Sequence, residues 1–343
     1  MGRHNASMPS KEKAQHRDAA IEWSERFRSW CVYDVNLVVE VLKSSHFVAV
    51  DFAGEYEKIE QRTGIDYTHV RRALHHIPLA NEGERHSQLR RDFAHVIRRR
   101  SAFAKEQVEQ FVSETLPKVL QSGRTIELIR DVVRPTTDSL FAGLVGMRPP
   151  ASDGPSPSQI FDRFLGLNRR KIVQNEVARL ADSFSEKAHK LATSNEYATA
   201  LTIVGYDSVV ASLGSSLLHV LHNAAGRRLN EIAYPDTLPT SGVPYVERVA
   251  KNDLRIDGQD FHAGDRLRLF LDGIPNKAVS ENVLFFGKGR HLCLGMDLSQ
   301  WVWRTLVREL AGIPLELRII EARLRRKDYV FNMYDSVKAS VHG

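Results

Sequence analysis

The chain has 343 residues, of which 42% are hydrophobic and 26% charged, a composition typical of a folded globular protein that excludes disorder for most of the sequence. It has no run of eighteen apolar residues, and its first residues are polar and charged. The sequence therefore predicts neither a membrane span nor a secretory signal, and we expect a cytoplasmic protein. In that compartment its two cysteines, Cys31 and Cys293, should stay reduced.

The net charge is +6, and the basic residues are clustered. One cluster contains Arg90, Arg91 and residues 98–100, and a second covers residues 323–327. Such clusters suit an acidic partner, although a solvated helix face would give the same pattern. No zinc-ligand spacing or RNA-binding signature accompanies the charge, so no nucleic-acid partner is expected.

The N-terminal half alternates between helical and irregular patterns. Residues 1–20 are polar and are expected to be flexible, and residues 21–343 are expected to form one domain. The pattern over 21–47 predicts a helix, a strand at 30–33 and a second helix. Residues 51–81 show few clear periods, whereas 82–120 predict two long charged helices. The Pro- and Gly-rich run at 148–155 predicts a loop.

In the C-terminal half, residues 160–190 have a helical pattern and residues 197–225 predict a long apolar helix. Pro235, Pro239 and Pro244 interrupt any helix that follows. Apolar residues alternate over 254–271 as in a small sheet, and a last helix at 294–311 precedes a strand-like tail. The predicted fold class is mostly α with a minor β portion.

The most specific motif is Phe-Gly-Lys-Gly-Arg-His-Leu-Cys-Leu-Gly at 286–295, directly before the last predicted helix. Its glycines allow a tight loop and close approach to a flat ligand. Cys293 would lie near a helix N-terminus, where free N–H groups and the helix dipole stabilise a thiolate. Such a thiolate is a haem iron ligand. The alternative is a structural cysteine in a glycine-rich turn.

The motif fits the pattern F-G-x-G-x-H-x-C-x-G and resembles the haem-binding loop of cytochromes P450. The resemblance implies a shortened P450-like fold that binds haem b (iron protoporphyrin IX). It makes Cys293 the iron ligand, and it makes Phe286, Gly287, His291 and Gly295 cofactor-binding residues.

Two further segments resemble the family's haem-propionate contacts. His86 and Arg90 lie one helical turn apart, as at the entry of the family's C helix. Arg248 resembles the strand arginine on the other propionate side, and His291 matches the histidine of the cysteine loop. Charge-assisted hydrogen bonds to carboxylates give these roles a physical basis. The alternative for each is a solvated surface side chain.

Val204-Gly205-Tyr206-Asp207-Ser208, within the long apolar helix, resembles the family's oxygen-activating motif. A glycine inside a helix costs about 1 kcal/mol, which room for dioxygen would justify. Asp207 and Ser208 would then be catalytic, as a proton relay; the alternative is a polar patch facing solvent. The resemblance also implies that the substrate pocket is lined by Val204, Gly205, Val243, Tyr245 and Val246.

The chain departs from the family in three ways. It is shorter than usual, and the meander expected between residues 271 and 286 is hard to find. The Glu-x-x-Arg of the family's K helix is absent, and the nearest candidate at that place is Glu231-Ile232-Ala233-Tyr234, which has Tyr where Arg belongs. Loss of a whole buried ionic network can be nearly neutral, whereas loss of one partner costs several kcal/mol. What supports the cysteine loop is therefore open.

The resemblance implies a monooxygenase of bacterial specialised metabolism that inserts one oxygen atom from O₂ into a small or medium organic substrate, free or carrier-bound. Electrons would come from a ferredoxin or flavodoxin that docks on the first arginine cluster. One alternative keeps the haem for peroxygenase, isomerase or dehydratase chemistry. Another is a non-catalytic haem- or ligand-binding helper.

Overall fold

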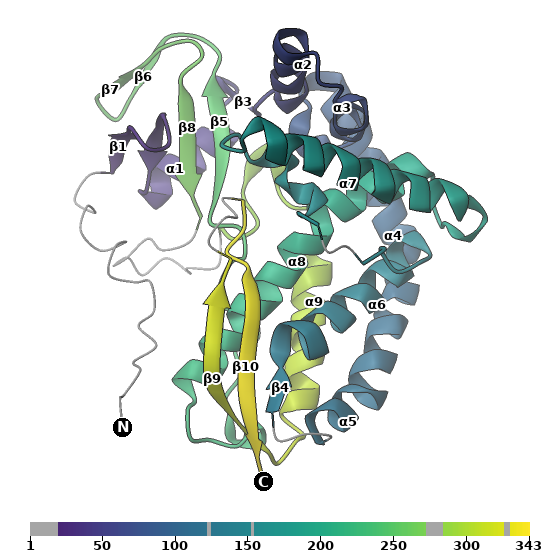
Figure 1. Cartoon of the computed structure of the whole chain (residues 1–343). Coiled ribbons are helices and arrows are strands. Elements are labelled where there is room, and N and C mark those ends of the chain that lie inside the picture. The colour runs from purple at the N-terminus through teal and green to yellow at the C-terminus, as the bar shows by residue number, and fades with distance from the viewer. Residues whose placement is uncertain (1–19, 122–124, 152–153, 272–283, 326–329) are drawn as a thin grey trace.

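The computed structural model describes residues 20–121, 125–151, 154–271, 284–325 and 330–343 (Figure 1). The predicted segment 1–20 lies outside the described residues except for Ala20, and most of the expected meander, 272–283, lies outside them as well. Within the described part, helices predominate and the β portion is minor, as predicted.

A five-stranded sheet combines three strands near the N-terminus with two strands from residues 245–270, in the order β1-β2-β8-β5-β3. Strands β2 and β8 are parallel, and the other neighbours are antiparallel. Its strands are β1 (Ile21–Ser24), β2 (Ser29–Val32), β3 (Phe47–Val48), β5 (Tyr245–Ala250) and β8 (Arg266–Phe270). Leu267 and Leu269 of β8 belong to the buried cluster that includes Val38 and Leu42 of α1 (Val35–Lys43). Because strand residues alternate between faces, Arg268 belongs to the other face.

Two smaller β elements complete the β portion. One is a three-stranded sheet in the order β4-β10-β9, built from β4 (Thr125–Glu127), β9 (Glu316–Leu324) and β10 (Tyr334–His342). The long β9–β10 pair runs beside the C-terminus in Figure 1. The other is the hairpin of β6 (Leu254–Ile256) and β7 (Gln259–Phe261), whose turn residues Asp257 and Gly258 both have positive φ, at 48° and 78°. Asp-Gly is a favoured dipeptide for such a turn.

The helices form the larger part of the molecule, with α7 crossing above α8 and α6 in Figure 1. They are α2 (Phe52–Thr63), α3 (Thr68–His75), α4 (Gly83–Glu114), α5 (Leu116–Gln121), α6 (Arg134–Val145), α7 (Leu167–Glu186), α8 (Asn195–Asn223) and α9 (Met296–Leu310). Helix α8 is the one helix of the described residues long and apolar enough to span a membrane, but 67% of its most apolar window is buried, as in a core helix.

Three of the predicted elements differ from the structure. The helix predicted at the start of 21–47 is wrong, because residues 21–24 form β1, where Trp23 pairs with Trp30 of β2 across the strands. Residues 51–81 contain α2 and α3, whose many charged and exposed residues obscured their period. The two long helices predicted over 82–120 are the 32-residue α4 and the short α5.

The segment between α8 and β5 has one short 3-10 turn, η5 (Leu229–Glu231), among its described residues. Glu231 accepts a hydrogen bond from the Arg228 backbone N–H at 3.0 Å within that turn. The segment is held to α9 instead: Trp303 Nε1 donates to the Pro235 carbonyl at 2.9 Å, and Gln300 Oε1 accepts from the Leu238 N–H at 3.0 Å. These bonds anchor the helix that follows the cysteine loop.

Candidate active site

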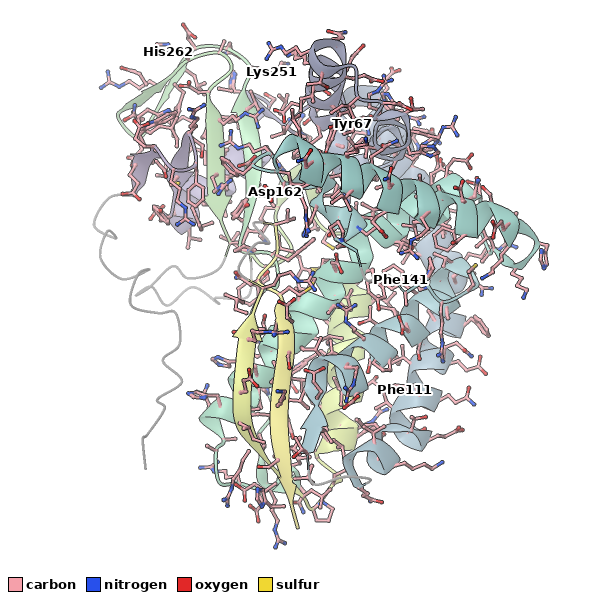
Figure 2. The ribbon with its side chains drawn as sticks, in the orientation of Figure 1. Tyr67, Phe111, Phe141, Asp162, Lys251 and His262 are labelled. Atoms are coloured by element: carbon pink, nitrogen blue, oxygen red, sulfur yellow. The ribbon has the colours of Figure 1, made fainter. Side chains whose placement is uncertain are left out.

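A cavity of about 330 Å³ lies between the cysteine loop, α8, the β5–β8 strands and the segment before α7. Phe141 of α6 and Asp162, both labelled in Figure 2, are among its lining residues. Most of the predicted site residues line this one cavity: Arg90, Val204, Gly205, Ser208, Val243, Tyr245, Val246, Arg248, Phe286, Gly287, His291, Cys293 and Gly295. Asp207 and His86 are not among its lining residues.

The cysteine loop is held by main-chain and arginine hydrogen bonds. The Cys293 N–H donates to the Phe286 carbonyl at 2.9 Å. Arg90 Nη1 donates to the Leu292 carbonyl at 2.7 Å, and Arg290 Nη2 donates to the Phe47 carbonyl at 2.6 Å. Arg90 therefore ties α4 to the loop. These bonds, together with the contacts of α9, support the loop, and the segment between α8 and β5 has no Glu-x-x-Arg among its residues.

Two loop glycines have backbone angles that favour glycine. Gly287 has φ +71° and Gly289 has φ +68°. A Cβ on Gly289 would lie 2.5 Å from the Leu42 carbonyl oxygen, so the loop could not pack against the end of α1 with a larger residue. A Cβ on Gly287 would meet only the His291 carbonyl oxygen, at 3.9 Å.

Cys293 is exposed by surface area, and the surface that it exposes faces the cavity. Desolvation in these surroundings raises the pKa of its thiol, while hydrogen bonds from the Gly295 and Met296 N–H groups and the charge of Arg90 act in the opposite direction. A cation placed in the cavity would add to these groups and favour the thiolate.

Glu82 is a site residue that the sequence reasoning missed. Its carboxylate accepts from the Ala49 N–H at 2.5 Å, lies 3.3 Å from His291 Nε2, and lies 3.5 Å from Arg290 Nη1. Burial alone would raise the Glu82 pKa, but the hydrogen bonds from His291 and Ala49 lower it to about 2. Glu82 is therefore ionised at neutral pH. It binds His291, which the sequence predicts to contact a haem propionate.

His86 and Arg248 lie deeper in the same cluster. The His86 ring packs on the His291 ring, with centroids 4.1 Å apart, and its Nε2 has no hydrogen-bond partner among the described residues. Desolvation lowers the His86 pKa to about 4, and desolvation of Arg248, which is 3% exposed, lowers its pKa to about 10. An anion beside these two side chains would stabilise their charged forms.

The adjacent residues Asp207 and Ser208 of α8 have different surroundings, and only Ser208 lines the cavity. Ser208 lines the cavity and its hydroxyl donates to the Gly205 carbonyl at 2.8 Å. Asp207 is buried, and its Oδ2 accepts from the hydroxyls of Ser156 and Ser158. The structure therefore joins Asp207 to the segment before α7 and not directly to the cavity.

Gly205 has a packing reason of its own, because a Cβ there would lie 2.9 Å from the Phe141 ring. The glycine lets α8 approach α6 at this point.

Comparisons with known proteins agree with this geometry. No family model matches the chain. A curated relative, cytochrome P450 CYP105Q4 of Mycobacterium marinum, is 20% identical over 316 residues, with 74% of each chain covered. The solved structure of P450BioI in complex with a hexadec-9Z-enoic acid-ligated acyl carrier protein has a TM-score of 0.74 at 18% identity, and the match covers 94% of each chain.

The chain has a cytochrome P450 fold. The thermophilic cytochrome P450 of Sulfolobus tokodaii gives a TM-score of 0.69 at 16% identity, covering 98% of this chain and 100% of that one. PksS, the P450 of the Bacillus subtilis bacillaene polyketide synthase, gives 0.68 at 15% identity, covering 92% and 91%. The curated relative, although only 20% identical, is a cytochrome P450 as well, in agreement with this fold.

The residues around the cavity fit the haem that a P450 fold implies. Cys293 faces the cavity, and the unpartnered His86 Nε2 and the buried Arg248 are cationic or hydrogen-bonding groups suited to propionates. Among the described residues no group of three or more His, Cys, Asp or Glu could hold a metal ion. In a haem the porphyrin supplies the other iron ligands, so a single thiolate such as Cys293 would suffice.

The sequence reasoning also missed an acidic residue and two arginines on the opposite wall. Glu247, Arg163 and Arg268 line the cavity. Glu247 directly precedes Arg248, and β-strand alternation was the signal that could have found it, since it puts neighbouring residues on opposite faces.

Proposed function

We propose that the protein is a haem-thiolate monooxygenase that inserts one oxygen atom from O₂ into a small or medium organic substrate in the cytoplasm of a bacterium. The observation that carries the proposal is Cys293, which faces a largely apolar cavity next to the Gly295 and Met296 N–H groups. Bound through that thiolate, haem b supplies O₂ activation and O–O cleavage.

The chain's own residues have separate roles in this proposal. Cys293 ligates the iron, and His86, Arg90, Arg248 and His291 hold the propionates, aided by Phe286, Gly287 and Gly295 in the loop. Ser208 places its hydroxyl oxygen at the cavity wall, where the hydroxyl donates to the Gly205 carbonyl at 2.8 Å. Asp207 Oδ2 accepts from the Ser156 and Ser158 hydroxyls, and we assign Asp207 with Ser208 to the proton relay.

The substrate pocket is the apolar remainder of the cavity. Val204 and Gly205 contribute one wall from α8, and Val243, Tyr245 and Val246 contribute another from β5 and the residues before it. Apolar walls exclude water from the reacting atoms and hold the substrate by its hydrophobic surface. A carrier-bound substrate is an option, because the P450BioI structure was solved with a ligated acyl carrier protein.

The electron donor is proposed to be a ferredoxin or flavodoxin. Arg85, Arg91 and Arg290 line a surface hollow on the α4 side of the cysteine loop. An acidic redox protein would be attracted to this surface, and salt would weaken the attraction. Arg91→Glu should reduce the rate of reduction by the donor about tenfold at low salt and much less at high salt.

The decisive experiment is the absorbance spectrum of the purified protein, as isolated and after reduction under carbon monoxide. We expect a long-wavelength Soret band of the thiolate type that Cys293→Ala abolishes. Cys31→Ala is the matched control, because Cys31 is fully buried in β2 and should leave the band unchanged. A protein without haem, or with haem that lacks the thiolate signature, would contradict the proposal.

One observation favours a second function, peroxygenase chemistry. Asp207 bonds Ser156 and Ser158 and is not among the cavity-lining residues, which would make delivery of protons to O₂ less direct. A peroxide carries its own protons and electrons and avoids this need. Turnover with hydrogen peroxide and no reductant, at a rate equal to or above that with ferredoxin and NADPH, would select this function.

A further inference from the structure

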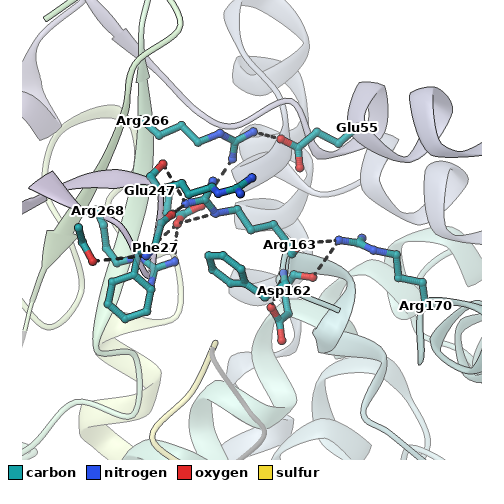
Figure 3. Close-up of polar contacts among 11 residues, drawn as sticks. Phe27, Glu55, Asp162, Arg163, Arg170, Glu247, Arg266 and Arg268 are labelled. Atoms are coloured by element: carbon teal, nitrogen blue, oxygen red, sulfur yellow. Dashed lines mark hydrogen bonds and ion pairs between the residues drawn. The ribbon is translucent and has the colours of Figure 1, made fainter. Parts of the chain in front are cut away.

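A cluster of arginines and carboxylates lies on the cavity wall formed by β5, β8 and the segment before α7 (Figure 3). Glu247 is at its centre. Its carboxylate oxygens lie 2.7 Å from Arg268 Nη2, 3.6 Å from Arg163 Nε and 3.8 Å from Arg266 Nη1. Arg266 also pairs with Glu55 of α2. Three guanidinium groups therefore share two carboxylates.

The surrounding groups do not balance this excess of positive charge. Asp162 adds one carboxylate, whose pKa burial raises and whose Oδ2 has no hydrogen-bond partner among the described residues. Arg170, which is 5% exposed, adds one guanidinium, which donates to the carbonyls of Leu165 and Arg163 at 2.9 and 2.7 Å. These two charges offset each other, so the excess of one positive charge remains. An uncompensated charge with little access to water attracts an anion.

Arg268 has hydrogen-bonding capacity left over. Its side chain is 2% exposed, and its guanidinium lies 4.0 Å from the ring centroids of both Phe27 and Tyr245. Its Nε and Nη2 donate to Glu247, whereas Nη1 has no partner within the described part of the chain. Buried N–H groups are normally paired, so an unpaired one beside a cavity suggests a missing acceptor. Arg163, whose side chain is 14% exposed, is the more accessible neighbour.

The rest of the cavity is apolar and continuous with this wall. Asp162, Arg163, Glu247 and Arg268 line the same cavity as Cys293. Its apolar lining includes Phe93, Ile97, Leu140, Phe141, Leu144 and Leu201. A ligand that matches both parts has an apolar body and one anionic end.

We propose that Arg163 and Arg268 form a subsite for the carboxylate of an amphipathic acid, with the apolar body of the acid in the cavity that Cys293 faces. This assignment rests on the proposed function, because it names the substrate class of the same cavity. The planar guanidinium fork matches a carboxylate. Arg163 Nη2 donates to the Phe27 carbonyl, whereas its Nε is 3.6 Å from Glu247, too far for a hydrogen bond, and is therefore the donor left for a ligand. Glu247 opposes the anion, and it limits the affinity of the subsite.

The test compares probes that differ only in the charged end. Isothermal titration calorimetry on the purified full-length protein, with whatever haem it retains, measures the dissociation constants of decanoate, methyl decanoate and decyl phosphate at fixed salt. We expect decanoate to bind about tenfold more tightly than its methyl ester, since a hydrogen bond to a charged group contributes that much. Equal affinities of acid and ester would overturn the proposal. Tighter binding of decyl phosphate than decanoate would overturn the carboxylate assignment.

Two variants separate recognition from structural support. Arg163→Met should reduce the acid-to-ester preference to about twofold or less. Glu247→Gln keeps an acceptor for the arginines but removes the opposing charge, so it should increase the preference by about threefold or more. Arg169→Met is the matched control, because Arg169 is exposed, bonds Gln159 and is not among the lining residues. A preference unchanged in Arg163→Met, or reduced in Glu247→Gln, contradicts the proposal.

Calorimetry reads the subsite independently of the haem spectrum. If the spectrum shows the thiolate band but acid and ester bind equally, the subsite proposal fails and the proposed function stands. If decanoate is preferred but the thiolate band is absent, the proposed function fails and the anion subsite remains.

Discussion

Strand β5 separates two clusters of cationic side chains that differ in how they are neutralised. Arg248 belongs to the cluster around Glu82, with His291 and Arg290, beside the cysteine loop. The preceding residue, Glu247, belongs to the cluster around Arg268 on the other face of the strand. We call these the Glu82 cluster and the Glu247 cluster. In each cluster several cationic groups surround one central carboxylate.

The two clusters differ in which polar groups have no hydrogen-bond partner among the described residues. In the Glu82 cluster, His86 Nε2 is unpaired and Arg248 is buried, as expected of a site that receives haem propionates. In the Glu247 cluster, Arg268 Nη1 is unpaired and two aromatic rings flank it, as expected of a site for the end of an organic molecule. One strand would thus position the cofactor on one face and orient the substrate with the other.

Removal of Arg268 tests whether the Glu247 cluster is a tightly coupled unit, and it has the largest expected effect. Arg268→Met should lower the free energy of unfolding by about 3 kcal/mol, because Glu247 loses its shortest ion pair inside the protein. This loss is smaller than for many buried ion pairs, because Arg163 and Arg266 remain near Glu247 and still compensate its charge. Urea denaturation measures the change. The double variant Arg268→Met/Glu247→Leu should recover most of it, and no recovery would contradict the model of a coupled pair.

The sequence predicted the Glu82 cluster far better than the Glu247 cluster. Cys293, His291, His86 and Arg248 were identified because family motifs with fixed spacing contain them. The Glu247 cluster combines residues 27, 163, 247 and 268, which come together only when β2, β5 and β8 pair and the segment before α7 packs against them. No local sequence pattern predicts that these distant residues lie together.

The fold shows the same division between local and long-range information. The apolar period of α8 and the glycine loop before α9 predicted those elements closely. Strand β1 was predicted as a helix, because its partner β2 and the Arg28 turn with φ 46° decide its conformation. Asp207 was predicted to face the oxygen site, but its Ser156 and Ser158 partners come from a loop about fifty positions away in the chain.

Removal of Arg248 tests the role assigned to the Glu82 cluster. Arg248→Met should weaken haem binding by about 10- to 100-fold, since it removes a buried charge-assisted partner of a propionate. Titration of the haem-free protein with haemin, followed at the Soret band, measures the affinity. Arg163→Met is the matched control on the other cluster and should change haem affinity less than twofold. Equal losses in the two variants would show that the two faces of β5 are not functionally separate.

Acid unfolding of the haem-free protein sharpens the comparison further, because two groups of the Glu82 cluster titrate in different windows. Burial lowers the His86 pKa from 6.5 to about 4, so the folded state prefers the neutral ring. The stability that this provides is present above pH 6.5 and is lost as the pH falls toward 4. The Glu82 pKa is lowered from 4.5 to about 2, so its contribution is present above pH 4.5 and is lost as the pH falls toward 2.

His86→Gln should therefore flatten the pH dependence of the unfolding free energy between pH 6.5 and 4 and leave the lower window unchanged. Glu82→Gln should flatten the lower window instead. Urea denaturation at a series of pH values measures both slopes. Asn252→Gln, an exposed position near the end of β5, is the control and should change neither. If His86→Gln left the upper slope unchanged, His86 would not be held neutral by its burial, and its unpaired Nε2 would no longer argue for a propionate beside it.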